Sequence, residues 1–487
     1  MWHPPVTAHA LREIAPLPDP LAAFAKLRAA AAPWLLESAL ADPRFGRFHF
    51  LGCDPWCVAR VRGSDIEVVL RRAPDGSPAG ERRVLRGDPF TALRALLPAR
   101  PAEPAPPFPF AGGLVGFLGY ELSAHCDGPP LHGRDDLDLP DAVLLGVDRA
   151  VAVERDRGRT WLSSLGRGDD LAAARERARQ GLDALQRALA ANPTRSGMSE
   201  GRTGPRAGAP RALLPDPDAG AYAKAVDAIL EEIAAGRVYQ ACLTQRIERR
   251  YAGDPFELYR ALRRINPAPF AACLLLPEVA ILGSSPERFL AVSREGGVES
   301  RPIKGTRPRG TTPEDDARLR AELLASPKER AENVMIVDLV RNDLGRVCSA
   351  GSVRVVELQV VEAYASVFQM VSTVRGRLAP GRDAFDAVRA CFPPGSMTGA
   401  PKRAAMQILD RLEPWRRGIY AGALGYFDAF GGADLSVVIR SAFVRDERAL
   451  LHAGGGVVAD SLPFAEHAEA QQKLAPLLRA LEEAQRS

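Results

Sequence analysis

The order of apolar runs along this chain constrains its fold more than any other feature of the sequence. Strand-like runs follow one another directly: FAACLLL (270–276) precedes VAILGSS (279–285), and GALGYFD (422–428) precedes LSVVIRSAFV (435–444). Helical patterns such as ERAENVMIVDLVRNDL (329–344) lie between these groups. Grouped strands with helices around them are typical of the α+β class rather than of strict βαβ alternation. The sequence therefore predicts an α+β fold.

The first half mixes the same kinds of element. We interpret DAVLLGVDRAVAVE (141–154) as strand, FAGGLVGFLGYEL (110–122) as a Gly-rich turn region and LAAARERARQGLDALQRALA (171–190) as a helix. Further along, Asp218 is placed to cap a helix. The apolar residues of that helix share one face: Tyr222, Val226, Ile229 and Ile233.

A break in the pattern divides the chain. Residues 191–215 are rich in Gly, Pro, Ser, Thr and Arg and have no hydrophobic periodicity, which indicates a flexible connector. We therefore expect an amino-terminal region of residues 1–190 and a carboxy-terminal region of residues 216–487. The length of 487 residues allows two or three structural units or one large integrated domain.

Charge and cysteine content exclude several classes of protein. The formal net charge is +4, from 64 basic and 60 acidic residues, which is too balanced to indicate nucleic-acid binding. Seven scattered cysteines suit reduced thiols, and no second close pair joins Cys53 and Cys57 to make a zinc site. There is no signal-peptide pattern and no apolar run long enough for a membrane span. We expect a soluble, cytoplasmic protein.

Two acidic helical motifs are the strongest physical pattern. Glu329 and Glu332 lie three residues apart in KERAEN, and Glu466 and Glu469 three apart in FAEHAEAQQK. Residues at i and i+3 share a helix face, so two facing helices would present up to four carboxylates, which suits Mg²⁺. The alternative is two solvated faces, with Lys328, Arg330 and Lys473 as surface pair partners.

A second pattern suits the recognition of an anion. Gly454, Gly455 and Gly456 follow a strand, so bare backbone there can approach a carboxylate. Arg440 lies near the end of an apolar strand, where a guanidinium is costly unless a carboxylate pairs with it. A β-bulge and a structural salt bridge would explain these two features equally well.

Two further residues stand in suggestive positions. Glu287 follows an apolar strand in GSSPERFL, where a carboxyl with a raised pKa would serve as a general acid, unless it pairs with an arginine such as Arg288. Lys304 lies in RPIKGTRPRG between two prolines that restrict the backbone. Either it is an incidental lysine of a basic loop or its amine is positioned for chemistry.

Taken together, these motifs resemble the chorismate-utilising enzymes. The resemblance is strongest from about Asp218 onward and extends to LLESA and GRFHFLGCDP in the first half. It implies a large layered α/β/β/α sandwich. The motifs that carry it are GRVYQACLTQR, GSSPERFL, RPIKGTRPRG, KERAENVMIVDLVRNDLGRV, FPPGSMTGAPK, YAGALGYF, SVVIRS, HAGGGVVADS and EHAEAQQK.

The residue inside PI-x-GT separates activities within that family. Members that make anthranilate usually have PIAGT, whereas members that make 4-amino-4-deoxychorismate for folate biosynthesis have PIKGT, and here the residue is Lys304. Replacing the ring hydroxyl of chorismate by ammonia with retained stereochemistry calls for two successive displacements. A nucleophilic lysine supplies the first of them. We expect nearby Mg²⁺ or apolar surface to lower the pKa of Lys304.

The resemblance also implies roles for other residues. Glu287 would be the general acid, and Glu332 and Glu469 would bind Mg²⁺ with Glu329 and Glu466 in support. Gln240 occupies the position of a base lysine in members that use water, and its amide cannot deprotonate water. The residues implied in substrate binding are Gln240, Gly305, Thr306, Gln369, Tyr420, Arg440, Gly454, Gly456 and Lys473.

The sequence departs from the family pattern at two positions. Gln369 replaces the histidine of the motif HLVS, which fits an enzyme that does not eliminate pyruvate. His49 stands where GRxSFLG has serine, in a candidate tryptophan pocket that would also contain Glu37, Ser38 and Arg47.

We find no glutaminase constellation, so the resemblance implies a separate glutamine amidotransferase subunit that supplies ammonia. Because the sequence ends soon after EHAEAQQK, we expect no fused lyase. Two alternatives stay open. One is an anthranilate-forming large subunit with an unusual lysine, and the other is a non-catalytic regulatory or scaffold subunit.

Overall fold

Two large β-sheets form the centre of the protein in the computed structural model, which describes residues 6–17, 19–40, 45–72, 79–191, 213–364 and 367–486. The strands of the eleven-stranded sheet are, in spatial order, β1 (Val6–Ile14), β10 (Arg159–Gly168), β9 (Arg149–Glu154), β3 (Phe48–Gly52), β2 (Trp34–Glu37), β12 (Phe270–Leu275), β13 (Ala280–Ser285), β22 (Ser441–Arg445), β23 (Arg448–Val457), β11 (Gln240–Arg250) and β19 (Gly399–Ala400).

The second sheet has twelve strands. In spatial order they are β16 (Ile303–Pro308), β18 (Val367–Arg377), β15 (Gly297–Arg301), β14 (Arg288–Val292), β21 (Ala433–Val437), β20 (Ala423–Asp428), β7 (Gly113–Leu118), β8 (Ala142–Val147), β4 (Cys57–Arg62), β5 (Asp65–Leu70) and β6 (Arg82–Arg86), with β17 (Arg354–Ala363) paired to β18 beside this path.

Both sheets contain strands from both sides of the connector. In the first sheet β2 pairs with β12, Glu37 opposite Ala271, and in the second β7 pairs with β20, Leu118 opposite Ala423. The two regions are therefore interleaved in one layered unit. Most of the expected connector, residues 192–212, lies outside the described residues.

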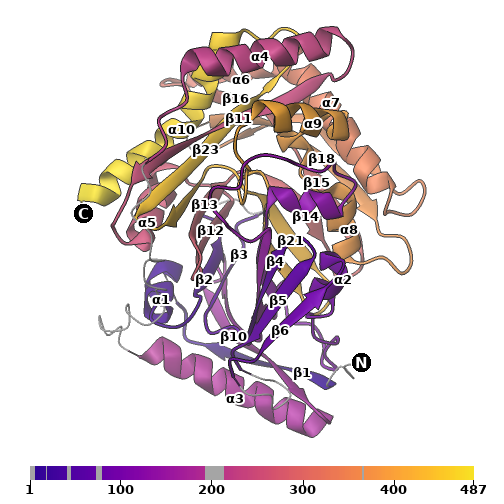
Figure 1. Ribbon diagram of the computed structural model, residues 1–487. Helices are drawn as coiled ribbons and strands as arrows, with labels where there is room; N and C mark the ends of the chain where they lie inside the picture. Colours follow the sequence, from indigo (N-terminus) through magenta and orange to yellow (C-terminus); the bar gives the residue numbers. More distant parts are fainter. Residues whose placement is uncertain are drawn as a thin grey trace.

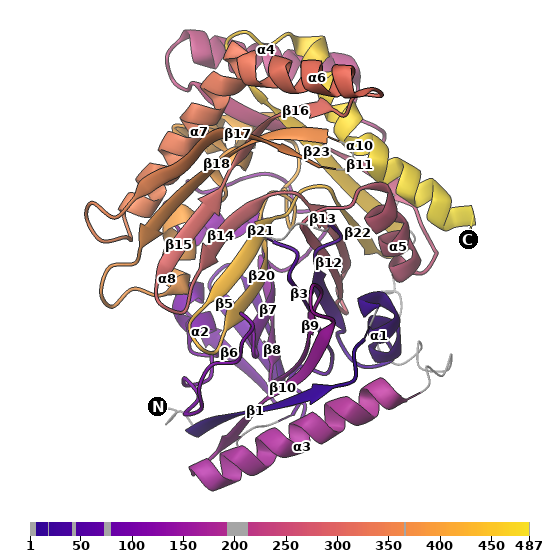
Figure 2. The same cartoon turned by 180° about the vertical axis from the view of Figure 1, so that it is seen from behind.

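Helices cover the outer faces of the two sheets (Figures 1 and 2). Those against the eleven-stranded sheet are α1 (Pro20–Leu27), α3 (Leu171–Ala190), α4 (Ala219–Ala234), α5 (Pro255–Ile265), α9 (Lys402–Leu412) and α10 (Pro463–Arg486). Those on the side of the twelve-stranded sheet are α2 (Pro89–Arg94), α6 (Pro313–Ala325), α7 (Pro327–Gly345) and α8 (Ala384–Cys391).

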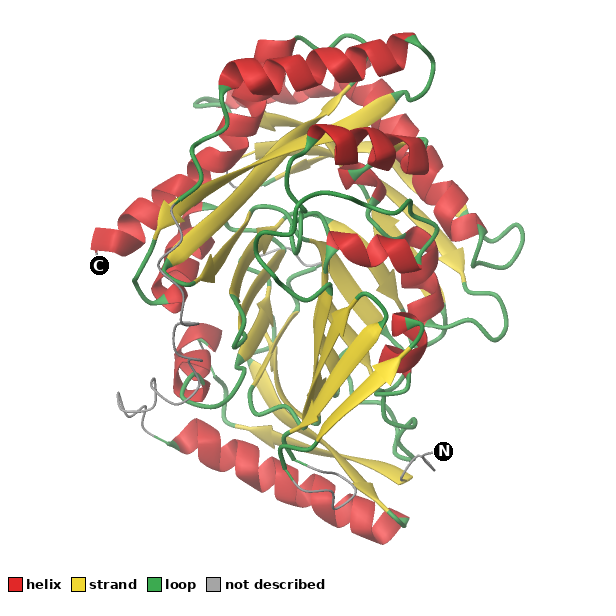
Figure 3. Cartoon of the chain, viewed as in Figure 1, coloured by secondary structure: helices red, strands yellow, loops and turns green. Residues whose placement is uncertain are grey.

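The largest core lies between the sheets. Phe50 of the first sheet packs on Tyr426 of the second, with ring centroids 5.9 Å apart, and Phe110 and Trp34 extend the cluster. A second core holds α10 and α5 against the outer face of the eleven-stranded sheet. Helices outside and strands inside, as coloured in Figure 3, confirm the predicted α/β/β/α sandwich.

The helix predicted after the connector is confirmed. Asp218 accepts a hydrogen bond from the Ala221 amide at 3.0 Å, and α4 buries Tyr222, Val226 and Ile229. The prediction of a turn at 110–122 is wrong at its centre, because residues 113–118 form the fully buried strand β7. Glycine is required there by close packing, since a Cβ at Gly116 would lie 2.0 Å from the Val143 carbonyl oxygen.

The run LSVVIRSAFV also differs from its interpretation as one strand. It contributes β21 to one sheet and β22 to the other. The chain crosses between the sheets at Val438–Arg440, and Arg440 has a left-handed backbone with φ of 52°.

No helix among the described residues is long and apolar enough to cross a bilayer.

Candidate active site

Lys304 lies on β16, an edge strand of the twelve-stranded sheet. The pairing of β16 with β18 shifts register between Ile303 and Thr306. Such a bulge changes the direction of the side chain of Lys304, which lies between these two residues. Gly305 has φ of 87°, and a Cβ there would lie 2.9 Å from Leu323 Cδ1 and 3.0 Å from Glu329 Oε2. Only glycine fits beside Lys304.

The Lys304 amine is held in a mostly buried position. Its Nζ lies 2.8 Å from Glu332 Oε1 and donates to the Ser396 carbonyl at 3.4 Å. Burial lowers the pKa of Lys304, but the negative charge of Glu332, joined by Cys242 and Glu287, outweighs this, so the pKa lies above its ordinary value. Burial acts in the direction that was expected, but the pairing with Glu332, which was not foreseen, acts in the opposite direction and is the stronger effect among the protein's own groups.

Glu332 lies on α7 and joins Lys304 to Gln240, the first residue of β11. Gln240 Nε2 donates to Glu332 Oε1 at 2.7 Å, while the other amide atom, Oε1, is buried without a partner among the described residues. Gly456 makes room for this contact, because a Cβ there would lie 2.1 Å from Gln240 Nε2 and 2.5 Å from Glu332 Oε1.

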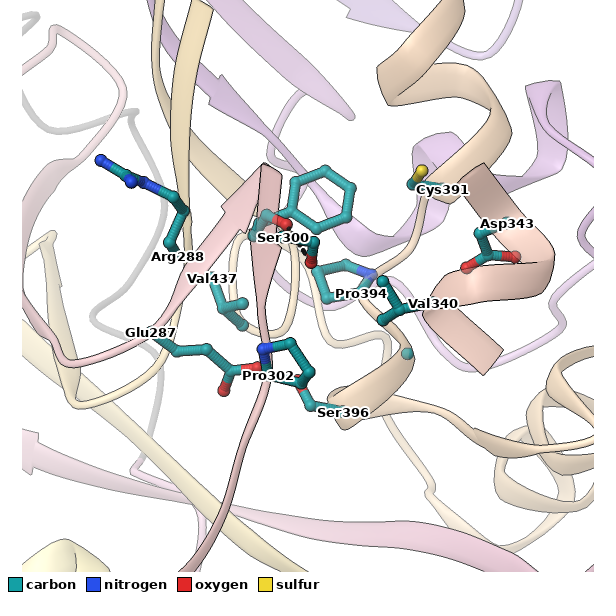
Figure 4. Close-up of a pocket in the computed structure, with 12 residues that line it drawn as sticks. Glu287, Arg288, Ser300, Pro302, Val340, Asp343, Cys391, Pro394, Ser396 and Val437 are labelled. Atoms are coloured by element: carbon teal, nitrogen blue, oxygen red, sulfur yellow. Dashed lines mark hydrogen bonds between the residues drawn. The ribbon is translucent and has the colours of Figure 1, made fainter. Parts of the chain in front are cut away.

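Glu287 lies between β13 and β14 and is 5% exposed. Burial raises the pKa of its carboxyl to about 7, and the neighbouring Ser396 hydroxyl and the charge of Lys304 oppose the rise only in part. Figure 4 shows the carboxyl turned toward Pro302 and Ser396 at a small cavity, with Arg288 pointing away. Arg288 pairs with Asp434 and Glu299 instead, so the salt-bridge alternative for Glu287 does not hold.

The two acidic helices meet at the glycine triplet of β23. A Cβ at Gly455 would lie 2.9 Å from Glu466 Oε2 and 3.7 Å from Glu469 Oε1, and Gly456 adjoins Glu332. The strand pairs regularly with β11, with Gly455 opposite Leu243, so it contains no bulge at the triplet. Three of the four predicted carboxylates therefore converge on bare backbone. The fourth, Glu329, pairs with Arg307 at 3.1 Å beside β16.

These carboxylates suit Mg²⁺ by their chemistry, since hard oxygen ligands on two helices and an open backbone can hold a hydrated cation. Within the described ranges, no three His, Cys, Asp or Glu side chains stand in a metal-binding arrangement. Each acid is ion-paired instead: Glu466 to Lys328 at 3.2 Å, and Glu469 to Lys473 at 2.6 Å.

Two cationic side chains lie near these acids: Arg440, between β21 and β22, and Lys473 on α10. Arg440 Nη1 donates to the Lys473 carbonyl at 3.2 Å, and none of the described carboxylates lies within ion-pair distance of its guanidinium. Burial lowers the pKa of Arg440, with partial compensation from Tyr420 and Glu469. Lys473 Nζ donates to the Gly454 carbonyl at 2.9 Å. A partly buried guanidinium without a carboxylate partner is suited to a bound carboxylate.

The remaining predicted residues lie on nearby strands and loops. Tyr420 is buried and stacks on His452 with ring centroids 4.9 Å apart. Thr306 is paired with Gln369 across β16 and β18. The Gln369 side-chain oxygen is buried without a partner among the described residues, which leaves an acceptor for a ligand.

The candidate tryptophan pocket lies where β2 meets β3. The Ser38 amide donates to His49 Nδ1 at 3.4 Å, and His49 lies 3.9 Å from Glu37 Oε2. Burial lowers the pKa of His49, which keeps the ring neutral at pH 7.

The acidic and basic groups of that pocket already have partners. Glu37 accepts hydrogen bonds from Tyr259 at 2.6 Å and from Arg263 at 2.7 Å, and Arg47 pairs with Glu154. The structure thus brings Glu37, Ser38 and His49 together and directs Arg47 to a different partner.

Two residues at the site were not among the predicted site residues. Ser396 lies in FPPGSMTGAPK, a motif that carried the resemblance but to which no residue role was assigned. Lys328 was considered only as a surface pair partner. Neither contact has a signal in local sequence, because Ser396 is 92 residues from Lys304 and Lys328 is 138 residues from Glu466.

A mostly buried lysine, a protonatable carboxyl and an arginine without a carboxylate partner lie around converging carboxylates, and this arrangement suits an anionic substrate. The family model described as chorismate binding enzyme matches residues 56–479. The chain therefore belongs to the family of chorismate binding enzymes.

Several relatives are similar over nearly all of the chain. An aminodeoxychorismate synthase of Streptomyces pristinaespiralis is 44% identical over 97% of this chain and 65% of its own length. An anthranilate synthase component 1 of Mycolicibacterium smegmatis is 39% identical over 95% of this chain and 88% of its own. The chain thus spans less than two thirds of the first of these relatives.

Solved structures show the same fold. Anthranilate synthase component I from Streptococcus pneumoniae superposes with a TM-score of 0.73 at 28% identity, over 90% of this chain and 93% of that one. The menaquinone-specific isochorismate synthase MenF from Escherichia coli has a TM-score of 0.67 at 18% identity, over 98% and 96%, and at that identity it supports the fold alone.

Proposed function

We propose that this chain acts as the large subunit of an aminodeoxychorismate synthase and converts chorismate and ammonia to 4-amino-4-deoxychorismate. The observation that carries the proposal is the Lys304 amine, buried 2.8 Å from Glu332 and beside the protonatable Glu287. Relatives named aminodeoxychorismate synthase at 44% identity support it.

The chemistry has two displacements. The Lys304 nitrogen forms a bond to the ring as the C–O bond to the ring hydroxyl breaks, and Glu287 gives its proton to that oxygen, so water leaves. The Lys304 ammonium must first lose a proton, and Glu332 is its nearest acceptor. Ammonia then forms the new C–N bond and the bond to Lys304 breaks. A proton lost by the incoming nitrogen restores Glu287, and Glu332 returns its proton to the released Lys304 amine.

The other predicted residues hold the substrate. Arg440, Lys473 and the backbone of Gly454 and Gly456 would pair with its carboxylates, and Tyr420, Gly305, Thr306 and Gln369 would line the remaining space. Mg²⁺ on Glu332 and Glu469, with Glu329 and Glu466 in support, would supply positive charge to the ring carboxylate. Gln240, which has an amide in place of a base, disfavours attack by water.

We propose a partner, a pathway and a compartment for this chain on the same basis. Ammonia would come from glutamine through a partner amidotransferase subunit. The product would serve 4-aminobenzoate and folate biosynthesis, and the compartment would be the cytoplasm.

Anthranilate synthase component I is the second candidate, favoured by relatives of that name at 39% identity. It would release pyruvate, whereas the proposed reaction keeps the enolpyruvyl group. A non-catalytic subunit is a third candidate, and turnover of any kind would exclude it.

The test combines product chromatography with intact-protein mass spectrometry. Chorismate, Mg²⁺ and an ammonium salt are given to the wild type, to Lys304→Ala and to Lys224→Ala, which alters an exposed lysine of α4. We expect aminodeoxychorismate without pyruvate, and a chorismate-derived adduct that Lys304→Ala alone abolishes. Anthranilate and pyruvate without an adduct would overturn the proposal.

A further inference from the structure

Each of the four carboxylates in the two acidic motifs is matched by a cationic side chain. The four contacts are Lys304 with Glu332, Arg307 with Glu329, Lys473 with Glu469 and Lys328 with Glu466. The negative charge that would hold a metal ion is thus neutralised within the protein. Binding of a divalent cation must compete with at least one of these groups.

Lys328 is the cation with the fewest ties. Lys304 is mostly buried and also donates to a backbone carbonyl, and Lys473 also donates to the Gly454 carbonyl. Among the described residues, Lys328 donates to Glu466 alone, and its side chain is 39% exposed. Its ammonium can move to solvent without breaking any other contact.

The position of Lys328 is unfavourable for its own helix. It lies in the first turn of α7, directly after Pro327, where the helix dipole favours acidic side chains. Its charge interacts instead with Glu466, Glu469 and Glu332, the three carboxylates that converge on the glycine triplet. Lys328 therefore supplies positive charge to the same group of acids that would bind the metal ion.

We propose that Lys328 is the exchangeable counter-ion of this site: its ammonium neutralises Glu466 in the metal-free protein and leaves when Mg²⁺ binds. Ser461 Oγ donates to the same Glu466 oxygen at 2.6 Å, so the carboxylate stays in place after the lysine departs. The inference rests on the proposed function, in which these acids hold Mg²⁺. Lys328 therefore weakens Mg²⁺ binding. When Mg²⁺ is absent, Lys328 reduces the repulsion among the carboxylates.

The test measures metal binding directly, without turnover. Full-length wild type, Lys328→Met, Lys328→Gln and the exposed-lysine control Lys224→Met are stripped with chelator and titrated with MgCl₂ by calorimetry. Thermal unfolding is followed with and without the metal. We expect both Lys328 variants to bind Mg²⁺ about fivefold or more tightly than wild type, with a larger rise of Tm on adding Mg²⁺. The control should match wild type.

The outcomes separate this inference from the function on which it rests. If wild type binds Mg²⁺ and the Lys328 variants bind with equal or lower affinity, the counter-ion role is overturned and the proposed metal site stands. If wild type does not bind Mg²⁺, the metal part of the proposed function fails and the inference fails with it. A lower Tm with an unchanged dissociation constant identifies a purely structural ion pair and also overturns the inference.

Discussion

Gln240 and Lys304 donate to the same carboxylate oxygen, Oε1 of Glu332, at 2.7 and 2.8 Å. Two donors on one oxygen fix the carboxylate in place, and with it the position of the amine. The first donor is fully buried on β11, while the second comes from the edge strand of the other sheet. Glu332 therefore joins the two sheets at the point where the proposed chemistry takes place.

Removing the Gln240 donor should slow catalysis. A hydrogen bond to a charged group contributes about 1.5–3 kcal/mol, so Gln240→Leu should lower kcat roughly tenfold to hundredfold. Gln245→Leu is the matched control, since that buried amide of the same strand has no hydrogen-bond partner among the described residues. Steady-state kinetics of both variants measure the loss of kcat. Equal losses in both would mean that the effect is one of packing.

The raised pKa of Glu287 predicts a pH-dependent loss of stability. Its ordinary pKa is 4.5 and its folded pKa is about 7, so the unfolded chain loses this proton first. The stabilising effect of the neutral buried carboxyl is complete below pH 4.5 and is lost as pH rises through 7. The full effect amounts to about 3 kcal/mol.

We therefore expect Glu287→Gln to gain about 2–3 kcal/mol in unfolding free energy relative to wild type between pH 5 and pH 8. Urea unfolding at the two pH values measures this difference. The exposed Glu231→Gln is the control, because its carboxyl meets solvent in both states. A difference between wild type and Glu287→Gln that does not change with pH would show that the pKa is ordinary.

Gly456→Ala should damage the site, because the added methyl group would overlap Gln240 Nε2 at 2.1 Å and Glu332 Oε1 at 2.5 Å. Activity should fall by roughly a hundredfold or more, as expected when catalytic groups are misplaced by an ångström. The same substitution at Gly345, whose Cβ position is open and helical, should leave activity intact and stabilise the protein by about 0.5–1 kcal/mol. Product assays and thermal unfolding compare the two. Normal activity of Gly456→Ala would show that Glu332 and Gln240 need not meet.

Local sequence was sufficient for many of the helices and strands and for the local placement of several candidate site residues. The three-residue spacing of Glu466 and Glu469 placed them on one face of α10, and GSSPERFL placed Glu287 after a buried strand. Lys304 gained its role only through the resemblance of PIKGT to a known family. The spacing of isolated motifs cannot distinguish a positioned lysine from one in a basic loop.

What the sequence could not provide were contacts between distant segments. Nothing near Glu332 indicates that Gln240, 92 residues away, would share its oxygen with a lysine. Periodicity also could not show that residues 435–444 divide between two sheets, because both parts are apolar and extended. The left-handed backbone of Arg440, which makes that crossing, is rare for a non-glycine residue and has no local signature.

The unpaired guanidinium of Arg440 leads to opposite effects on binding and on stability. Arg440→Asn should weaken chorismate binding roughly tenfold to hundredfold, because a charged hydrogen-bond donor to the substrate is lost. The free energy of unfolding should nevertheless rise by about 1 kcal/mol, since asparagine tolerates φ of 52° and removes a partly buried charge that has no carboxylate partner. Arg440→Lys keeps the charge without the planar fork and should bind with intermediate affinity. Calorimetric titration with chorismate measures the affinity, and urea unfolding measures the stability. A loss of both in Arg440→Asn would show that the guanidinium serves the fold rather than the substrate.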